Sequence, residues 1–134
     1  MIEKLHSKGI STVIISSTNL SENQNQLICY ASTCNNNGTT NKHIIYKIEI
    51  EKLAFNFNGT GDLFAALFLA WFHKTNSDLK VSLEKSISIL QDIIKTTYQF
   101  AMKNDFKQKV ELKLIQSIDN ILSPKTQLEA IRIN

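Results

Sequence analysis

The residues in this sequence best suited to chemistry are Gly59-Thr60-Gly61-Asp62, which stand directly before an apolar run. Two glycines one residue apart let the backbone turn sharply and leave amide N–H groups uncovered by a Cβ atom. The run from Leu63 to Phe72 predicts a helix, so these amides and the helix dipole would point at one place and bind an anion there. A carboxylate beside an anion site indicates that a proton or a metal ion is handled there too. Phosphoryl transfer to a hydroxyl group is the simplest chemistry that needs both.

The same short pattern also has a purely structural interpretation. Asp62 can serve as no more than a favourable negative charge at the start of a helix, and the four residues by themselves do not decide between the two. The neighbouring residues and the rest of the chain therefore have to be considered.

Composition and charge exclude several classes of protein. The 134 residues suit one domain or a piece of one, and 43% apolar with 20% charged residues allow a packed core. A net charge of +3 with scattered lysines and no basic stripe argues against nucleic-acid binding. The sequence contains no apolar run of about 18 residues, and Met1 to His6 lacks the apolar segment of a signal peptide, so we predict neither a membrane span nor export.

Cysteine and histidine are the other residue types with possible chemistry. Cys29 and Cys34 are the two cysteines, and His6, His43 and His73 are far apart along the chain. This spacing does not have the pattern of a zinc site, and we predict two thiols rather than a disulfide.

Hydrophobic periodicity predicts strands followed by helices. A short helix over 2–8 ends at Gly9, and this abrupt beginning suggests a chain that starts in the middle of a fold. Strands are predicted over 11–17, as a central strand covered on both faces, and over 26–31 and 43–50, as a hairpin. An Asn-rich turn over 34–41 lies between the two hairpin strands.

The second half of the chain is mostly helical. Thr60 or Gly61 is predicted to cap a helix that runs to about 73 and is apolar nearly all round, hence interior. Residues 76–78 cap an amphipathic helix over 79–102 with Glu84 and Gln91 on its outer face. A charged loop over 104–109, a strand over 111–116, a helical turn over 117–122 and an edge strand over 128–133 follow. This order of strands and helices predicts an α/β sheet protein with its functional site at the carboxyl ends of the strands.

One long stretch resembles a known family. Phe57-Asn58-Gly59-Thr60-Gly61-Asp62-Leu63-Phe64-Ala65-Ala66-Leu67-Phe68-Leu69-Ala70-Trp71 is similar to the Phe-X-Gly-Thr-Gly-Asp-Leu-Phe-Ala-Ala motif and following Ala-Trp of eukaryotic-type pyridoxal kinases, in the ribokinase-like superfamily. The segments 13–17, 73–85, 111–117 and 121–124 extend the resemblance over nearly the whole chain. The resemblance implies the C-terminal part of a three-layer α/β/α fold with a mixed, mostly parallel sheet. Residues 1–134 would be the nucleotide-side portion of one kinase domain, without its N-terminal substrate-binding half.

The resemblance also implies an activity and a set of site residues. The activity is ATP-dependent phosphorylation of the 5′-hydroxymethyl group of pyridoxal, pyridoxine and pyridoxamine. Asp62 would be the catalytic residue, and Gly59, Thr60 and Gly61 would form the anion hole for the transferred phosphoryl group. The implied ATP-binding residues are Ser16, Ser17, Leu53, Phe57, Asn58, Phe64 and Ile94. Asn58 departs from the family, which often has a small or β-branched residue there.

Cofactors and partners follow from the resemblance alone. It implies ATP with Mg²⁺, a monovalent cation, a homodimer and a cytoplasmic location, whereas the sequence itself contains no complete set of metal ligands. Two alternatives stay open at this stage. The chain could be a non-catalytic ATP-binding or dimerisation remnant, or it could come from a related kinase for hydroxymethylpyrimidine or a sugar.

Overall fold

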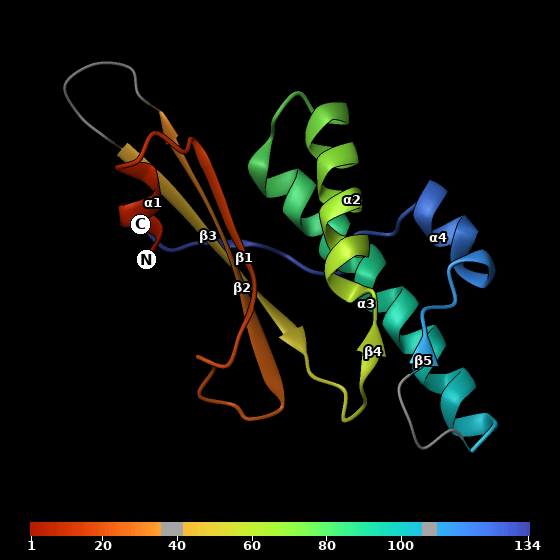
Figure 1. Ribbon diagram of the computed structural model, residues 1–134. Coiled ribbons are helices and arrows are strands. Elements are labelled where there is room, and N and C mark those ends of the chain that lie inside the picture. Colours follow the sequence, from red (N-terminus) through yellow and green to blue (C-terminus); the bar gives the residue numbers. More distant parts are fainter. Residues whose placement is uncertain (36–41, 106–109) are drawn as a thin grey trace.

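The computed structural model describes residues 1–35, 42–105 and 110–134 (Figure 1). Residues 36–41 of the Asn-rich turn predicted over 34–41, and residues 106–109 of the predicted charged loop, lie outside the described residues. Cys34 and Asn35, predicted in that turn, instead end a strand. The elements run in the order α1 (Ile2–His6), β1 (Thr12–Thr18), β2 (Gln26–Asn35), β3 (Lys42–Glu51), β4 (Phe57–Asn58), α2 (Thr60–Lys74), α3 (Leu79–Lys103), β5 (Val110–Glu111), η1 (Ile115–Ser117), α4 (Ile118–Leu122) and β6 (Ile131–Arg132).

The larger sheet has the strand order β1-β2-β3-β6, and every pairing in it is antiparallel. The predicted hairpin is confirmed, with Leu27 opposite Ile50 and Cys34 opposite His43. The α/β class is confirmed as well, but in the described residues only the short β4–β5 pair is parallel. The expected mostly parallel sheet is therefore not formed by these residues, because β1, β2 and β3 follow one another without the helical crossover that parallel neighbours need.

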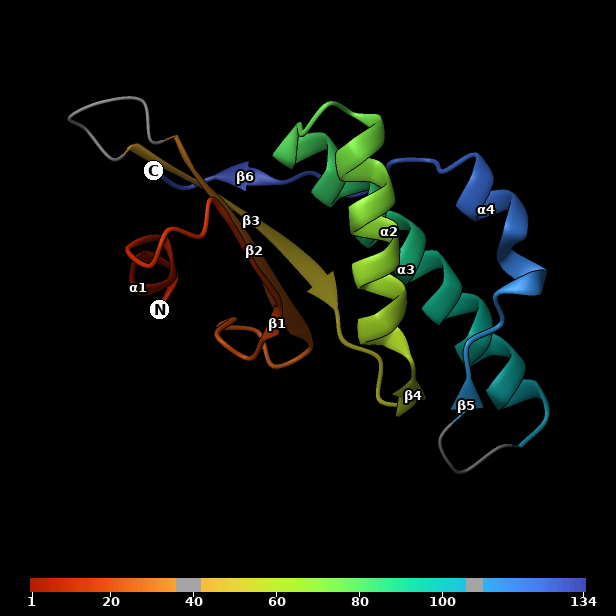
Figure 2. The same ribbon diagram turned by 45° about the horizontal axis from the view of Figure 1, so that its top comes forward.

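Helices α2 and α3 lie on the same side of this sheet in both views (Figures 1 and 2). The core between the two layers joins the sheet residues Cys29 and Ile48 to Leu83 and Ile87 of α3 and to Phe64 of α2. Leu83 and Ile87 are at most 1% exposed, as the spacing of four residues on one helix face predicts. Among the described residues, no helix is long and apolar enough to cross a membrane.

Three sequence expectations about burial are corrected. The helix α2 was expected to be interior, but only Phe64 and Leu67 are buried and Leu69 is 71% exposed, because α3 covers one side of it. The strand β1 was expected to be central, yet it forms an edge of the sheet in the described residues. Glu84 and Gln91 were expected on the outer face of α3, whereas the Gln91 side chain is buried and that of Glu84 is only 12% exposed.

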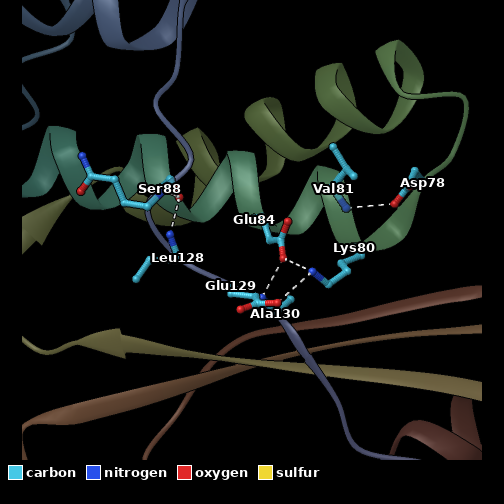
Figure 3. A network of polar contacts seen from close by, with 9 residues as sticks. Asp78, Lys80, Val81, Glu84, Ser88, Leu128, Glu129 and Ala130 are labelled. Atoms are coloured by element: carbon cyan, nitrogen blue, oxygen red, sulfur yellow. Dashed lines mark hydrogen bonds and ion pairs between the residues drawn. The ribbon is translucent and has the colours of Figure 1, made fainter.

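The C-terminal segment explains why Glu84 is covered. The segment crosses α3 and is held by polar contacts (Figure 3): Glu84 Oε1 accepts hydrogen bonds from the Ala130 amide at 2.9 Å and from Lys80 Nζ at 2.6 Å. The Ser88 hydroxyl oxygen accepts from the Leu128 amide at 3.4 Å. After these contacts the chain continues into β6, which is shorter than the edge strand predicted over 128–133. Of the predicted strand over 111–116, only Glu111 belongs to β5, and Ile115 and Gln116 belong to η1 instead.

Candidate active site

A pocket of about 280 Å³ lies where β1, β2 and β3 come closest to the start of α2. Its size is near the lower end of small-molecule sites, which run from about 300 to 1,000 Å³. Side chains from the sheet, the β3–α2 connection, α2 and α3 line it together: Ser16, Ser17, Leu27, Ile50, Glu51, Lys52, Leu53, Phe55, Asn56, Phe57, Thr60, Gly61, Phe64, Leu90, Gln91 and Ile94.

Most of the residues that the sequence singled out meet in this pocket. Those that line it are Ser16, Ser17, Leu53, Phe57, Thr60, Gly61, Phe64 and Ile94. Asn58, Gly59 and Asp62 are exposed next to these residues but are not part of the lining. The segments involved are up to 78 residues apart in sequence, from Ser16 to Ile94, and only the fold brings them together.

The two serines lie in a disturbed part of β1. The register of β1 against β2 shifts between Ile15 and Thr18, so Ser16 and Ser17 have no Cα partners in the ladder. A bulge of this kind bends the strand and redirects its side chains, and it is common beside binding sites. Both serines are exposed, so their hydroxyl groups are available to a ligand at the pocket wall.

The glycine turn has the backbone geometry of an anion site. Gly59 has a φ of 81°, a left-handed conformation that suits glycine, and α2 begins at Thr60. Gly59 therefore occupies the N-cap position that was expected at Thr60 or Gly61, and it has no side chain with which to cap the helix. The first intrahelical bond runs from the Leu63 amide to the Gly59 carbonyl at 3.0 Å. The amides of 60–62 have no acceptor within the described part of the chain, and they remain available to a ligand.

Asp62 lies in the first turn of α2, where the helix dipole attracts negative charge. Its side chain is exposed, and within the described residues its carboxylate takes part in no hydrogen bond or ion pair. Among these residues Asp62 is therefore not held in a structural ion pair, and its position beside the pocket-lining turn leaves it open to a substrate.

Several pocket residues were missed by sequence reasoning. Gln91 was assigned to the outer face of α3, but its side chain is buried, and its Oε1 atom has no hydrogen-bond partner among the described residues. Glu51 lies at the rim and forms an ion pair with Lys95 at 3.3 Å. Phe55 packs against Phe57 and Tyr98, with ring centroids 5.4 and 6.1 Å away. The aromatic spacing of 55 and 57 was a usable signal, whereas nothing in the local sequence marks Gln91.

The pocket does not contain a cluster of metal ligands. Within the described residues, no group of three histidine, cysteine or acidic side chains converges at this pocket. Glu51 is its one acidic lining residue and is already paired with Lys95.

Comparison with known proteins finds pyridoxal kinases among the curated relatives. No protein-family model matches the chain. A pyridoxal kinase of Dictyostelium discoideum is 37% identical over 120 residues, which is 87% of this chain and 40% of that protein. The human pyridoxal kinase is 36% identical over 140 residues, which is 97% of this chain and 45% of that protein. The chain thus spans less than half the length of the curated relatives it matches.

The fold agrees with these matches. The structure of Plasmodium falciparum PdxK with the ligands AMP-PNP and PL is similar with a TM-score of 0.77 and 30% identity. The likeness covers 98% of this chain and 41% of that one. In sequence and in fold, therefore, nearly the whole of this chain is related to about two fifths of a pyridoxal kinase.

Proposed function

We propose that residues 1–134 form the C-terminal, nucleotide-side portion of a pyridoxal kinase domain, which transfers the γ-phosphoryl group of ATP to the 5′-hydroxymethyl group of pyridoxal, pyridoxine or pyridoxamine. The observation that carries this proposal is the convergence of the predicted ATP-binding residues on one pocket, whose wall includes the turn before Asp62. The substrate-binding half would be supplied by chain outside these residues, so this portion alone is expected to be inactive.

The apolar part of the pocket suits the base of a nucleotide. Leu27, Leu53, Phe57 and Ile94 offer apolar surface, and Phe64 closes the wall from α2. Ser16 and Ser17 are exposed polar residues of the same lining, and their hydroxyl groups would contact the phosphates. Such a division between an apolar wall and a few polar groups is typical of cofactor sites.

The turn at 59–62 would hold the phosphoryl group during transfer. Amides at 60–62 are fixed by the start of α2, so they need no reorganisation as negative charge moves onto the transferred oxygens. Phosphoryl transfer depends mainly on positioning and on stabilisation of charge, which this backbone supplies without any side chain. Gly59, with its left-handed backbone, sets the direction of the turn.

Asp62 would act on the acceptor hydroxyl. Its ionised carboxylate accepts a hydrogen bond from the hydroxyl, orients the oxygen toward the phosphorus atom, and takes the proton as the oxygen–phosphorus bond forms. Positioned general bases contribute typically about 10²–10⁴-fold to rate. The absence of a competing ion pair at Asp62, among the described residues, supports this role.

Other parts of the proposal rest on the resemblance to pyridoxal kinases. The described residues do not supply a carboxylate cluster for Mg²⁺ at the pocket, so we derive no step through Mg²⁺ or through a monovalent cation. A homodimer and a cytoplasmic location are proposed on the same basis.

The test is an assay of ATP-dependent phosphate transfer to pyridoxal by the complete protein and by residues 1–134 alone. We expect turnover only in the complete protein. There, Asp62→Asn should lower kcat about 10²–10⁴-fold and leave ATP affinity unchanged. Asp119→Asn is the matched control, because Asp119 also lies in the first turn of a helix, α4, but away from the pocket.

Three results would contradict the proposal. Near-normal turnover by the Asp62→Asn protein would remove Asp62 from the reaction. ATP binding without transfer to pyridoxal in the complete protein would instead favour a non-catalytic remnant, and transfer only to a pyrimidine or a sugar would favour a related kinase.

A further inference from the structure

Three side chains that are far apart in sequence meet at the end of the sheet opposite the pocket. One ring nitrogen of His6, one of His43 and the sulfur of Cys34 all lie within 4.8 Å of one another. His6 and Cys34 are buried and His43 is half-buried. The imidazole rings of the two histidines are stacked, with centroids 4.8 Å apart and an angle of 24° between their planes.

The fold builds this cluster from three elements. Cys34 of β2 and His43 of β3 are directly opposite each other in the hairpin register, so the ladder itself holds them side by side. The helix α1 brings His6 over them from the N-terminal end of the chain. The amide of Cys34 donates to the Ser11 carbonyl at 2.9 Å, which holds the segment after α1 against β2.

The hydrogen bonds of His6 determine which of its nitrogen atoms carries the proton. His6 Nδ1 lies 2.6 Å from the carbonyl oxygen of Ile10. A carbonyl only accepts, so Nδ1 donates, and in the neutral ring the lone pair is on Nε2. Nε2 lies 2.8 Å from the Ser32 hydroxyl, which donates to it. A histidine whose Nδ1–H is held by a backbone carbonyl while Nε2 keeps its lone pair has the arrangement found in metal-binding histidines.

His43 supplies the second, independent observation. Its Nδ1 atom is buried and has no hydrogen-bond partner among the described residues. A buried polar atom without a partner is rare in proteins and calls for an explanation such as an ion or an ordered water. Here the orphaned nitrogen belongs to the same cluster as a thiol and a second imidazole.

We propose that His6, Cys34 and His43 bind a zinc ion, through His6 Nε2, the Cys34 sulfur and His43 Nδ1. A thiolate with two imidazoles is a soft, nitrogen-rich set that suits Zn²⁺ and does not suit Mg²⁺ or Ca²⁺. With Zn–N of about 2.0–2.1 Å and Zn–S of about 2.3 Å, tetrahedral ligand atoms lie about 3.4–3.6 Å apart. Ligand atoms of the three side chains already lie within 4.8 Å of one another, so they must close by at most about 1.4 Å to bind the ion.

Binding changes few bonds. The Cys34 thiol releases its proton to solvent as the zinc–sulfur bond forms, and the hydrogen bond from Ser32 to His6 Nε2 is exchanged for a zinc–nitrogen bond. The Nδ1–H bond to Ile10 stays and orients the ring. The fourth position is left for an oxygen, either water or the Ser32 hydroxyl, which is the protein oxygen beside Nε2.

The place of the site indicates a structural role. Cys34 is seven residues along β2 from Leu27, which lines the candidate active site, so the two sites are about 23 Å apart at about 3.3 Å per residue. Zinc at the cluster would join α1 to the far end of the β2–β3 hairpin. It would stabilise the sheet that carries Ser16 and Ser17, without touching the nucleotide.

The test is zinc binding by the intact, reduced protein. After dialysis against excess Zn²⁺ and removal of loosely held metal, we expect one zinc per chain by elemental analysis and a higher Tm than for the chelator-treated protein. Loss of a ligand in Cys34→Ser or His43→Gln should weaken zinc binding by more than the roughly 10–100-fold that loss of an outer partner costs. The zinc-dependent rise in Tm should disappear in both variants.

Two controls match these variants. Cys29→Ser removes the other cysteine, which lies on the same strand, and His73→Gln removes the exposed histidine of α2. Both should bind zinc as the unsubstituted protein does. Co²⁺ gives a further readout that does not depend on stability, because a Co²⁺–thiolate charge-transfer band should form in the unsubstituted protein and be lost in Cys34→Ser.

The proposal is overturned if the dialysed protein holds no zinc. It is also overturned if Cys34→Ser and His43→Gln, folded as judged by circular dichroism, bind zinc as tightly as the His73→Gln control. In either case the cluster is a hydrogen-bonded histidine stack that only supports the fold.

Discussion

Replacing each glycine of the candidate phosphate-binding turn by alanine should separate backbone strain from ligand contact. Gly59 has a φ of 81°, whereas Gly61 is in the first turn of α2 with an ordinary helical backbone. Apart from the adjoining residues and the nearby backbone of α2, an added Cβ atom would meet no heavy atom of the described residues within 4 Å at either position. The two substitutions therefore differ in backbone conformation and not in steric crowding.

The magnitude follows from this difference. Both substitutions reduce the entropy of the unfolded chain by the same amount, which stabilises the folded protein by about 0.4–1 kcal/mol where the backbone is compatible. Gly61→Ala should show this gain. Gly59→Ala has in addition the cost of a left-handed residue with a Cβ atom, about 1–2 kcal/mol. The free energies of unfolding of the two variants should thus differ by about 1–2 kcal/mol, with Gly61→Ala the more stable.

Urea unfolding followed by circular dichroism measures these free energies, and a thermal melt should show a separation of about 3–5 °C for each kcal/mol. ATP affinity is expected to follow a different order. Gly61 lines the pocket, so its new methyl group would stand where the phosphate approaches the backbone, and binding should weaken although the protein is more stable. Equal free energies of unfolding for the two variants would refute the backbone conformation described for the turn.

Three further predictions concern stability and reactivity. Glu84→Ala should destabilise the protein by about 1–3 kcal/mol in urea unfolding, because it leaves the buried Ala130 amide without its acceptor, and Glu84→Gln, which keeps an acceptor oxygen, should cost less. The hydrogen bond to Glu84 raises the pKa of Lys80. The stability that this pair contributes should therefore be present below pH about 10.4 and be lost as the pH rises through the raised pKa. Urea unfolding at a series of alkaline pH values should show this loss in the unsubstituted protein and not in Glu84→Gln. Burial raises the pKa of the Cys29 thiol to about 12, so iodoacetamide at pH 8 should modify Cys29 only after unfolding, and rapid modification of the native protein, seen by peptide mass spectrometry, would contradict its burial.

The local sequence predicted most of the elements because their signals are short-range. The α3 helix follows from apolar residues at spacings of three and four and from Asp78, whose side chain accepts from the Val81 amide at 2.9 Å as a helix cap should. The hairpin of β2 and β3 follows from two largely apolar runs around a polar turn sequence. The glycine turn could be located to the residue, although its cap proved to be Gly59.

Burial could not be predicted as well, since it depends on what packs against each face. Helix α2 has an apolar sequence but is buried on one side only. The polar side chain of Gln91 is buried beside the pocket, and that of Glu84 lies under the C-terminal segment. The place of β1 in the sheet was also misjudged, because a strand sequence that is apolar on both faces does not specify how many neighbouring strands it has.

By itself, then, the sequence determined the helices, the hairpin, and a turn whose residue types suit phosphate chemistry, since each of these depends on residues a few positions apart. Only the tertiary structure decided that Ser16, Leu53 and Ile94 share one pocket, and that His6 meets Cys34 and His43 at the other end of the strands. The spacing of residues along the chain does not specify which distant residues lie close together, because strand register and helix packing decide this.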